Sequence, residues 1–211
     1  VTLCGSDRSQ MRACMRERYA ELSDSCQSEL RARMEARGGE QGKRGGGTAA
    51  QAPAPQTLAY GSDALQGLDL WVPEGAKGAP LVLFVHGGGW KRGSKDNAAG
   101  GWKQVHYPAS GYAYASINYR LVPGATVEQQ AADVALALKA LLDRAASLGI
   151  DRRRVVLSGH SAGAHLVALV GTDEQYLRAA GLAFADIDGV IPNDGAAYDV
   201  AAQMKDGGPM M

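Results

Sequence analysis

The residues best suited to chemistry lie at 159–163, where the sequence reads Gly-His-Ser-Ala-Gly. An apolar run at 155–157 precedes this motif, and an apolar segment typical of a helix follows it at once. In a strand, tight turn and helix of this kind, the residues two before and two after the serine must lack bulk, and the hydroxyl is held out above the sheet. The helix start also favours a developing negative charge. The sequence therefore predicts that Ser161 is a nucleophile, with an inert serine at a tight turn as the alternative.

A serine that attacks a carbonyl produces an oxyanion, which needs two or more preorganised N–H donors. The residue after the nucleophile, Ala162, supplies one of them. The others must come from a loop that can bring its bare backbone against the substrate. The sequence His-Gly-Gly-Gly-Trp at 86–90 meets this requirement, because it follows directly on the apolar run 81–85. A second glycine triplet at 45–47 has no strand before it and indicates only a flexible chain.

The elements that must position these motifs alternate between strands and helices from Thr57 onward. The predicted strands are 57–60, 67–72, 81–85, 113–118, 155–158 and 189–191. Apolar residues repeat along one face of 127–148, which predicts an amphipathic helix of several turns. Short apolar strands that alternate with helices indicate an α/β fold, with a mostly parallel sheet and helices on both faces. In such sheets, ligands bind at the carboxyl ends of the strands.

Three further motifs accompany the serine and glycine motifs. They are INYRLVP at 117–123, IDRRRVVLSGHSAG at 150–163 and NDGAAYDV at 193–200. With them, the segment from about Tyr60 to Asp199 resembles the α/β-hydrolase superfamily, in particular the carboxylesterase and acetylesterase branch with a His-Gly-Gly-Gly motif. The stretch GHSAGAHL is also similar to kynurenine formamidase and feruloyl-esterase-like members. This resemblance implies an α/β-hydrolase fold with Ser161 as nucleophile. The oxyanion donors that it implies are Gly88, Gly89 and Ala162.

The acid and the base of the reaction do not follow the pattern of that superfamily, in which Asp or Glu and then His come after the serine. The one histidine after Ser161 is His165, a single helical turn further on, where we expect it to pack locally. The catalytic histidine is therefore predicted to be absent from the chain. Asp194 is a candidate acid by its position after the strand 189–191, and a structural Asn-Asp-Gly turn is the alternative. We expect the chain to be truncated at both ends and to lack the last strands of the fold.

Three parts of the chain are distinguished by composition. Segment 1–36 has a helical pattern and holds all three cysteines, Cys4, Cys14 and Cys26, and part of it weakly resembles a bacterial cysteine-rich repeat. Segment 37–56 is predicted to be a flexible linker, and 57–211 the hydrolase domain. Clustered cysteines favour disulfides and hence a periplasmic or secreted protein, whereas three buried free thiols would fit a cytoplasmic one.

The charges argue against a nucleic-acid partner. The 22 basic and 22 acidic residues balance, and the basic residues form no positively charged stripe along the sequence. The apolar runs are too short for a membrane span. The sequence best fits a serine carboxylic-ester hydrolase that cleaves short-chain or acetylated small-molecule esters without metal or cofactor. The alternatives are an aryl formamidase or amidase with the same nucleophile, and a non-catalytic fragment or binding domain. The oligomeric state is not predicted.

Overall fold

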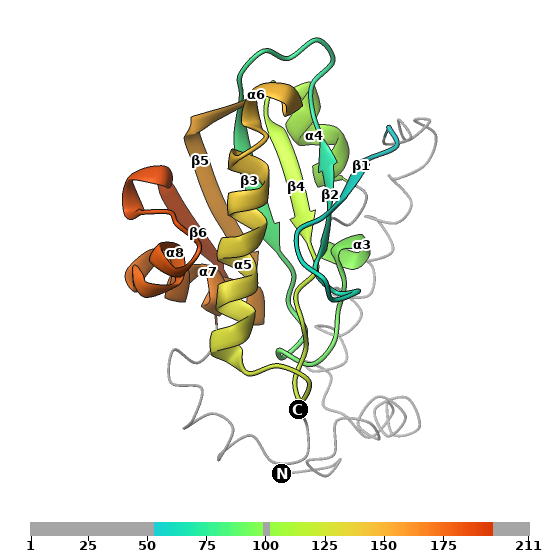
Figure 1. Ribbon diagram of the computed structural model, residues 1–211. Helices are drawn as coiled ribbons and strands as arrows, with labels where there is room; N and C mark the ends of the chain where they lie inside the picture. The colour runs from blue at the N-terminus through green and yellow to red at the C-terminus, as the bar shows by residue number, and fades with distance from the viewer. Residues whose placement is uncertain (1–52, 99–101, 196–211) are drawn as a thin grey trace, which may run out of the picture. The chain divides into compact units, whose positions relative to one another are not determined.

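Six strands form one sheet in residues 53–98 and 102–195, which are those described by the computed structural model (Figure 1). The strands are β1 (Gln56–Ala59), β2 (Gly67–Trp71), β3 (Ala79–Val85), β4 (Ala113–Ile117), β5 (Ile150–His160) and β6 (Gly189–Asn193). Their order across the sheet is β1-β2-β4-β3-β5-β6. The pairings among β3, β4, β5 and β6 are parallel, and β2 pairs antiparallel with β1 and β4. The predicted α/β class and mostly parallel sheet are confirmed. The predicted cysteine segment 1–36 and the linker as far as residue 52 lie outside the described residues.

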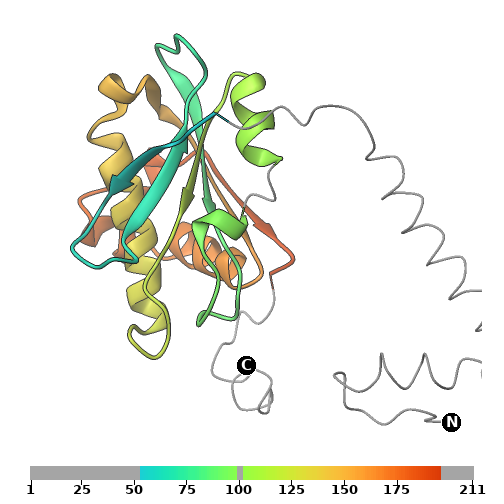
Figure 2. The ribbon, with the colours of Figure 1, turned by 90° about the vertical axis from the view of Figure 1, so that its right-hand side faces the viewer.

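Helices cover both faces of this sheet, as the turned view in Figure 2 shows. On one face lie α5 (Val127–Leu142), α7 (Ala162–Thr172) and α8 (Gln175–Ala179). On the other lie α3 (Lys95–Ala98) and α4 (Lys103–Ala109). Because side chains alternate along a strand, Leu83 of β3 belongs to the large core under α5 and α7, while Phe84 joins a smaller cluster with Tyr114 and Tyr107 of α4.

The predicted helix 127–148 is wrong in one respect, since it is divided in two. α5 ends at Leu142, and a short helix α6 (Ala145–Leu148) follows after a two-residue break. Gly149 then stops α6 in a left-handed conformation, with φ of 72°. The apolar pattern continues across the break because Ala145 is buried as well. The periodicity therefore gave no sign of the change in direction.

The strands that flank the site are longer than predicted. β3 begins at Ala79 and β5 at Ile150, and these two residues pair with each other. The residues between Ile150 and Val155 are polar and charged, so hydropathy alone marked only the inner part of β5 as a strand. β3 ends at Val85 as predicted, whereas β5 continues to His160, two residues beyond the predicted end.

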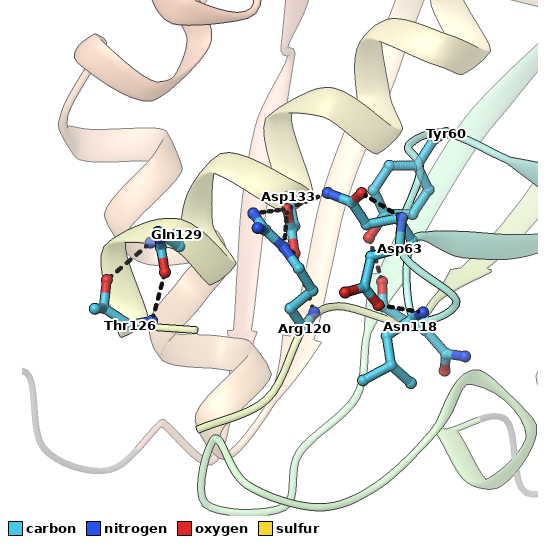
Figure 3. A network of polar contacts seen from close by, with 9 residues as sticks. Tyr60, Asp63, Asn118, Arg120, Thr126, Gln129 and Asp133 are labelled. Atoms are coloured by element: carbon cyan, nitrogen blue, oxygen red, sulfur yellow. Dashed lines mark hydrogen bonds and ion pairs between the residues drawn. The ribbon is translucent and has the colours of Figure 1, made fainter. Parts of the chain in front are cut away.

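A buried polar network holds α5 against the loop between β1 and β2 (Figure 3). The Asp133 side chain is fully buried and accepts hydrogen bonds from the Arg120 guanidinium, at 2.7 and 2.9 Å, and from Gln66 Nε2 at 2.8 Å. Tyr60 donates its hydroxyl to the carbonyl of Asn118 at 2.6 Å. Arg120 belongs to the INYRLVP motif, so this motif supports the fold beside the site.

Candidate active site

Ser161 lies between the end of β5 and the start of α7, with φ of 53° and ψ of −118°. Non-glycine residues rarely adopt such a conformation, and in known structures it is concentrated at functional sites. Two backbone hydrogen bonds hold it in place: Ser161 N–H donates to the carbonyl of Asn193 at 3.0 Å, and His165 N–H donates to the carbonyl of Ser161 at 3.1 Å. The local geometry is that of the strand, turn and helix predicted from the sequence.

The two glycines of the motif are required by close backbone contacts. A Cβ atom at Gly159 would lie 2.2 Å from the carbonyl oxygen of Gly163. A Cβ atom at Gly163 would lie 2.2 Å from the carbonyl oxygen of Val85 and 2.5 Å from that of His86. The turn at Ser161 therefore packs directly against the start of the glycine loop.

The glycine loop passes beside Ser161. A Cβ atom at Gly87 would lie 3.0 Å from Cβ of Ser161 and 2.8 Å from the carbonyl oxygen of His160. Gly88 has φ of 135° and Gly89 φ of 59°. Gly87 and Gly88 line the same pocket as Ser161, whereas Gly89 does not. Ala162, the first residue of α7, is buried. The structure thus brings one of the two predicted glycine donors to the pocket, and the donor roles themselves stay predictions.

His86 fixes the base of this loop. Its ring stacks on Tyr119 with 4.3 Å between centroids, and its Nδ1 lies 2.8 Å from the carbonyl oxygen of Gly87. The Tyr119 hydroxyl donates to the carbonyl of His86 at 2.9 Å. Burial lowers the pKa of His86, so the imidazole is held neutral and Nδ1–H is the donor to Gly87. These contacts give His86 a role in shaping the loop.

Trp90, the last residue of the motif at 86–90, is buried and anchors the end of the glycine loop. It has φ of 62°, and its carbonyl accepts hydrogen bonds from Gln130 Nε2 at 2.8 Å and from the Val122 N–H at 3.0 Å. The Trp90 and His165 rings pack edge-to-face, with 5.6 Å between their centroids. Burial lowers the pKa of His165, and Glu128 opposes this only in part. The His165 side chain is thus part of the packing beneath the glycine loop.

Ser161 opens into a pocket of about 560 Å3 at the carboxyl end of the sheet. The residues that line it are Phe84, Gly87, Gly88, Lys103, Tyr107, Ser158, His160, Ser161 and Asn193. Ser158 pairs with Phe84 in the sheet, and its Oγ accepts a hydrogen bond from Asn193 Nδ2 at 3.1 Å. The sequence prediction missed Lys103, Tyr107, Ser158 and Asn193. The alternation of side chains along β5 could have revealed Ser158.

Asp194 lies in a turn directly after β6, with φ of 50° and a side chain that is 91% exposed. Its carboxylate comes within 3.9 Å of Nε2 of His160. His160 is the residue directly before Ser161 and belongs to the same tight turn. The structure therefore places the candidate acid beside a histidine of the turn, and its catalytic role stays a prediction. The remaining histidine, His106, stacks on Trp102 at 4.2 Å.

Two searches of the described residues gave a negative result. No group of three or more side chains from His, Cys, Asp and Glu could hold a metal ion in the part of the chain that the structure describes. Within the same residues, no helix combines the length and the apolar character that crossing a membrane requires.

Comparisons with known proteins agree with this geometry. A model of the BD-FAE family matches residues 68–191. Esterase LipC of Mycobacterium tuberculosis is 36% identical over 123 residues, which cover 56% of this chain and 30% of LipC. Kynurenine formamidase of Danio rerio is 29% identical over 112 residues, covering 53% of this chain and 36% of that protein. The structure of a thermophilic esterase from Thermogutta terrifontis aligns with a TM-score of 0.50 and 27% identity, over 56% of this chain and 44% of that chain. The matched part of the chain thus covers between 24% and 36% of the length of such curated relatives.

Proposed function

Because the chain belongs to the BD-FAE family of α/β-hydrolase esterases, we propose that it is a serine carboxylic-ester hydrolase. Its substrates are short-chain or acetylated esters, which it cleaves through an acyl-enzyme. The observation that carries this proposal is the strained Ser161 backbone beside Gly87, with both residues in one pocket. The similarity to proteins named as esterases supports an ester as the substrate.

The proposed reaction begins when Ser161 Oγ attacks the carbonyl carbon of the ester and gives its proton to a base. The N–H groups of Ala162 and of the glycine loop then hold the oxyanion. Collapse of this intermediate breaks the C–O bond, the alcohol leaves with the proton, and water hydrolyses the acyl-enzyme. The lowered pKa of His86 keeps the residue before the glycines uncharged, so the loop holds its shape without a buried cation.

The base is proposed to be a histidine that these 211 residues do not contain. His86 and His165 are buried beneath the glycine loop, and His106 stacks on Trp102. His160 adjoins Ser161 in the chain but has its ring beside Asp194. Each of the four histidines thus has a local structural partner.

Labelling with a fluorophosphonate probe tests the nucleophile directly. We expect Ser161 to be labelled in a form of the protein that supplies the downstream histidine, and labelling to disappear in the same form with Ser161→Ala. The substitution Ser147→Ala is the matched control, because Ser147 is exposed on α6 and does not line the pocket, and it should leave Ser161 reactive. If neither the 211-residue chain nor the longer form is labelled, the proposal is wrong and the chain is a non-catalytic binding domain.

An aryl formamidase or amidase is the second candidate, favoured by the GHSAGAHL stretch at 159–166 and by the similarity to a kynurenine formamidase. It would use the same serine and the same oxyanion donors on a C–N bond. Rates of hydrolysis of N-formylkynurenine and p-nitrophenyl acetate by the same preparation separate the two. A higher kcat/KM for the acetate ester supports the carboxylesterase.

A further inference from the structure

Lys103 is the one lysine or arginine that lines the pocket at Ser161 among the described residues. It is the first residue of α4 and is half-buried. Its ammonium nitrogen lies 3.3 Å from the centre of the Phe84 ring. Burial lowers the pKa of Lys103, because the charged form loses contact with water. The pocket therefore contains a partly desolvated positive charge.

This charge has no acidic partner within the part of the chain that the structure describes. The pocket lining holds no aspartate or glutamate. Of the other described lysines, Lys95 pairs with Asp69 and Lys139 pairs with Asp143. The remaining two, Lys77 and Lys91, are exposed to solvent. Lys103 thus combines partial burial with the lack of a counter-ion among residues 53–98 and 102–195.

A half-buried ammonium is unfavourable unless a neighbouring group compensates for the lost water. The face of the Phe84 ring does this only in part, because it offers a quadrupole and no full charge. Since Ser158 Oγ accepts from Asn193, the Ser158 hydroxyl hydrogen can donate to a ligand. Tyr107, one helical turn after Lys103, also lines the pocket with its aromatic ring. An anionic group would find a cation and a hydrogen-bond donor here.

We propose that Lys103 determines substrate specificity by binding a carboxylate on the ester that Ser161 cleaves. The preferred substrates are then esters that carry one negative charge beside the reacting group. In a hemiester of a dicarboxylic acid, the free carboxylate belongs to the acyl part. In a hydroxy acid that is acylated on its hydroxyl group, the free carboxylate belongs to the alcohol part. This inference rests on the proposed esterase function, whose substrate class it narrows.

Equilibrium binding to the 211-residue chain tests the inference without any need for turnover. Two pairs of stable amide analogues are compared by isothermal titration calorimetry at low salt. N-butylsuccinamate against N-butylsuccinamide reports on the acyl side, and N-butanoyl-β-alanine against its primary amide reports on the alcohol side. We expect at least one acid to bind roughly tenfold more tightly than its matched neutral amide, as a charge-assisted hydrogen bond in a partly buried site would give.

Three variants attribute this preference to the side chain. Lys103→Met should abolish it, and Lys103→Arg should keep most of it because the charge remains. Lys139→Met is the matched control, since it removes an exposed lysine of α5, and it should leave the preference unchanged. Circular dichroism checks folding, and Lys103→Gln replaces Lys103→Met if the latter does not fold.

Equal binding of acid and amide in both pairs, or no binding of any ligand, overturns the inference. A preference that survives in Lys103→Met and Lys103→Gln overturns it as well. Fluorophosphonate labelling separates this failure from that of the proposed function. If Ser161 is labelled and no anion preference is found, the proposed esterase function stands and the role of Lys103 is wrong. If an anion preference is found without labelling, Lys103 binds an anion but the proposed esterase function is wrong.

Discussion

The chain leaves no room for a side chain at Gly159 or at Gly163, two residues before and two residues after Ser161. The carbonyl oxygens of Val85, His86 and Gly163 stand 2.2 to 2.5 Å from where a Cβ atom would lie at Gly159 or Gly163. This crowding explains why the motif was readable from sequence, because only glycine satisfies such contacts. Lys103 was not readable in the same way. Its proximity to Phe84 arises from packing between segments that no local pattern connects.

Gly163→Ala should lower the free energy of unfolding by about 1–3 kcal/mol, because the added methyl group forces the helix start away from the carbonyl of Val85. Gly189→Ala is the matched control, since no atom lies within 4 Å of the position of its Cβ and its φ is not positive. Urea denaturation of the two variants and the parent chain measures both effects. Equal stability of Gly163→Ala and the parent would mean that the turn is looser than the contacts indicate.

At the scale of elements, α5 shows how one helix carries two kinds of ion pair. Asp133 is fully buried and receives a guanidinium and an amide, whereas Asp143 at the end of the helix pairs with Lys139 in solvent. A capping box formed by Thr126 and Gln129 starts this helix, with each side chain bonded to the backbone of the other. Asp133 holds α5 to the segment after β4 through Arg120 and to the loop before β2 through Gln66, whereas the pair of Lys139 and Asp143 stays within the helix.

Asp133→Ala should destabilise the fold by about 2 kcal/mol, because buried Gln66 is left without its acceptor and Arg120, with a side chain 29% exposed, loses a partner that water replaces only in part. Asp143→Ala on the same helix should cost less than about 0.5 kcal/mol, since water replaces the lost partner. Thermal or urea denaturation of both variants gives the comparison. Similar losses in the two variants would show that burial of the pair does not control its contribution.

The strands and the long helix after β4 could be predicted from sequence, and the short helices could not. All six strands were expected near their observed positions because apolar runs and glycine turns mark them. α4 was missed because it has seven residues, contains Pro108 and presents no fully buried side chain. Its place depends on the stacking of Tyr107 on Tyr114, at 5.2 Å between ring centroids. The tertiary contact defines this helix, so its own sequence carries little signal.

For the whole molecule, the class of fold and the end of the sheet at which the site lies could be predicted from the residues alone. The fold class followed from the alternation of strands and helices along the chain. The position of the site followed because the glycine loop and the serine come directly after β3 and β5, two strands that pair in parallel. The cysteine segment with Cys4, Cys14 and Cys26 lies outside the described residues, so the predicted oxidising compartment stays a prediction. The glycine loop and the nucleophile turn share one buried support, which connects the stability of the fold to the shape of the site.

This shared support makes the stability of the molecule depend on pH. His86 and His165 are 3% and 6% exposed, and burial lowers the pKa of each below its ordinary value of 6.5. As the pH falls through 6.5, the unfolded chain binds protons that the folded chain does not accept. The free energy of unfolding therefore decreases on acidification, by at most about 1.4 kcal/mol per pH unit for each histidine, until the folded pKa is reached.

We expect the melting temperature to fall between pH 7.5 and pH 5.5, and the fall to be smaller in His165→Gln, which removes one of the two buried imidazoles. Thr172→Ala is the control, because it changes an exposed, uncharged residue at the end of the same helix α7 and should leave the slope unchanged. Differential scanning calorimetry of the three proteins across this range measures the slopes. An identical slope in His165→Gln and the parent would show that protonation beneath the glycine loop does not limit stability. A smaller slope in His165→Gln would show that the imidazole of His165, one helical turn after Ser161, contributes to the pH dependence of stability.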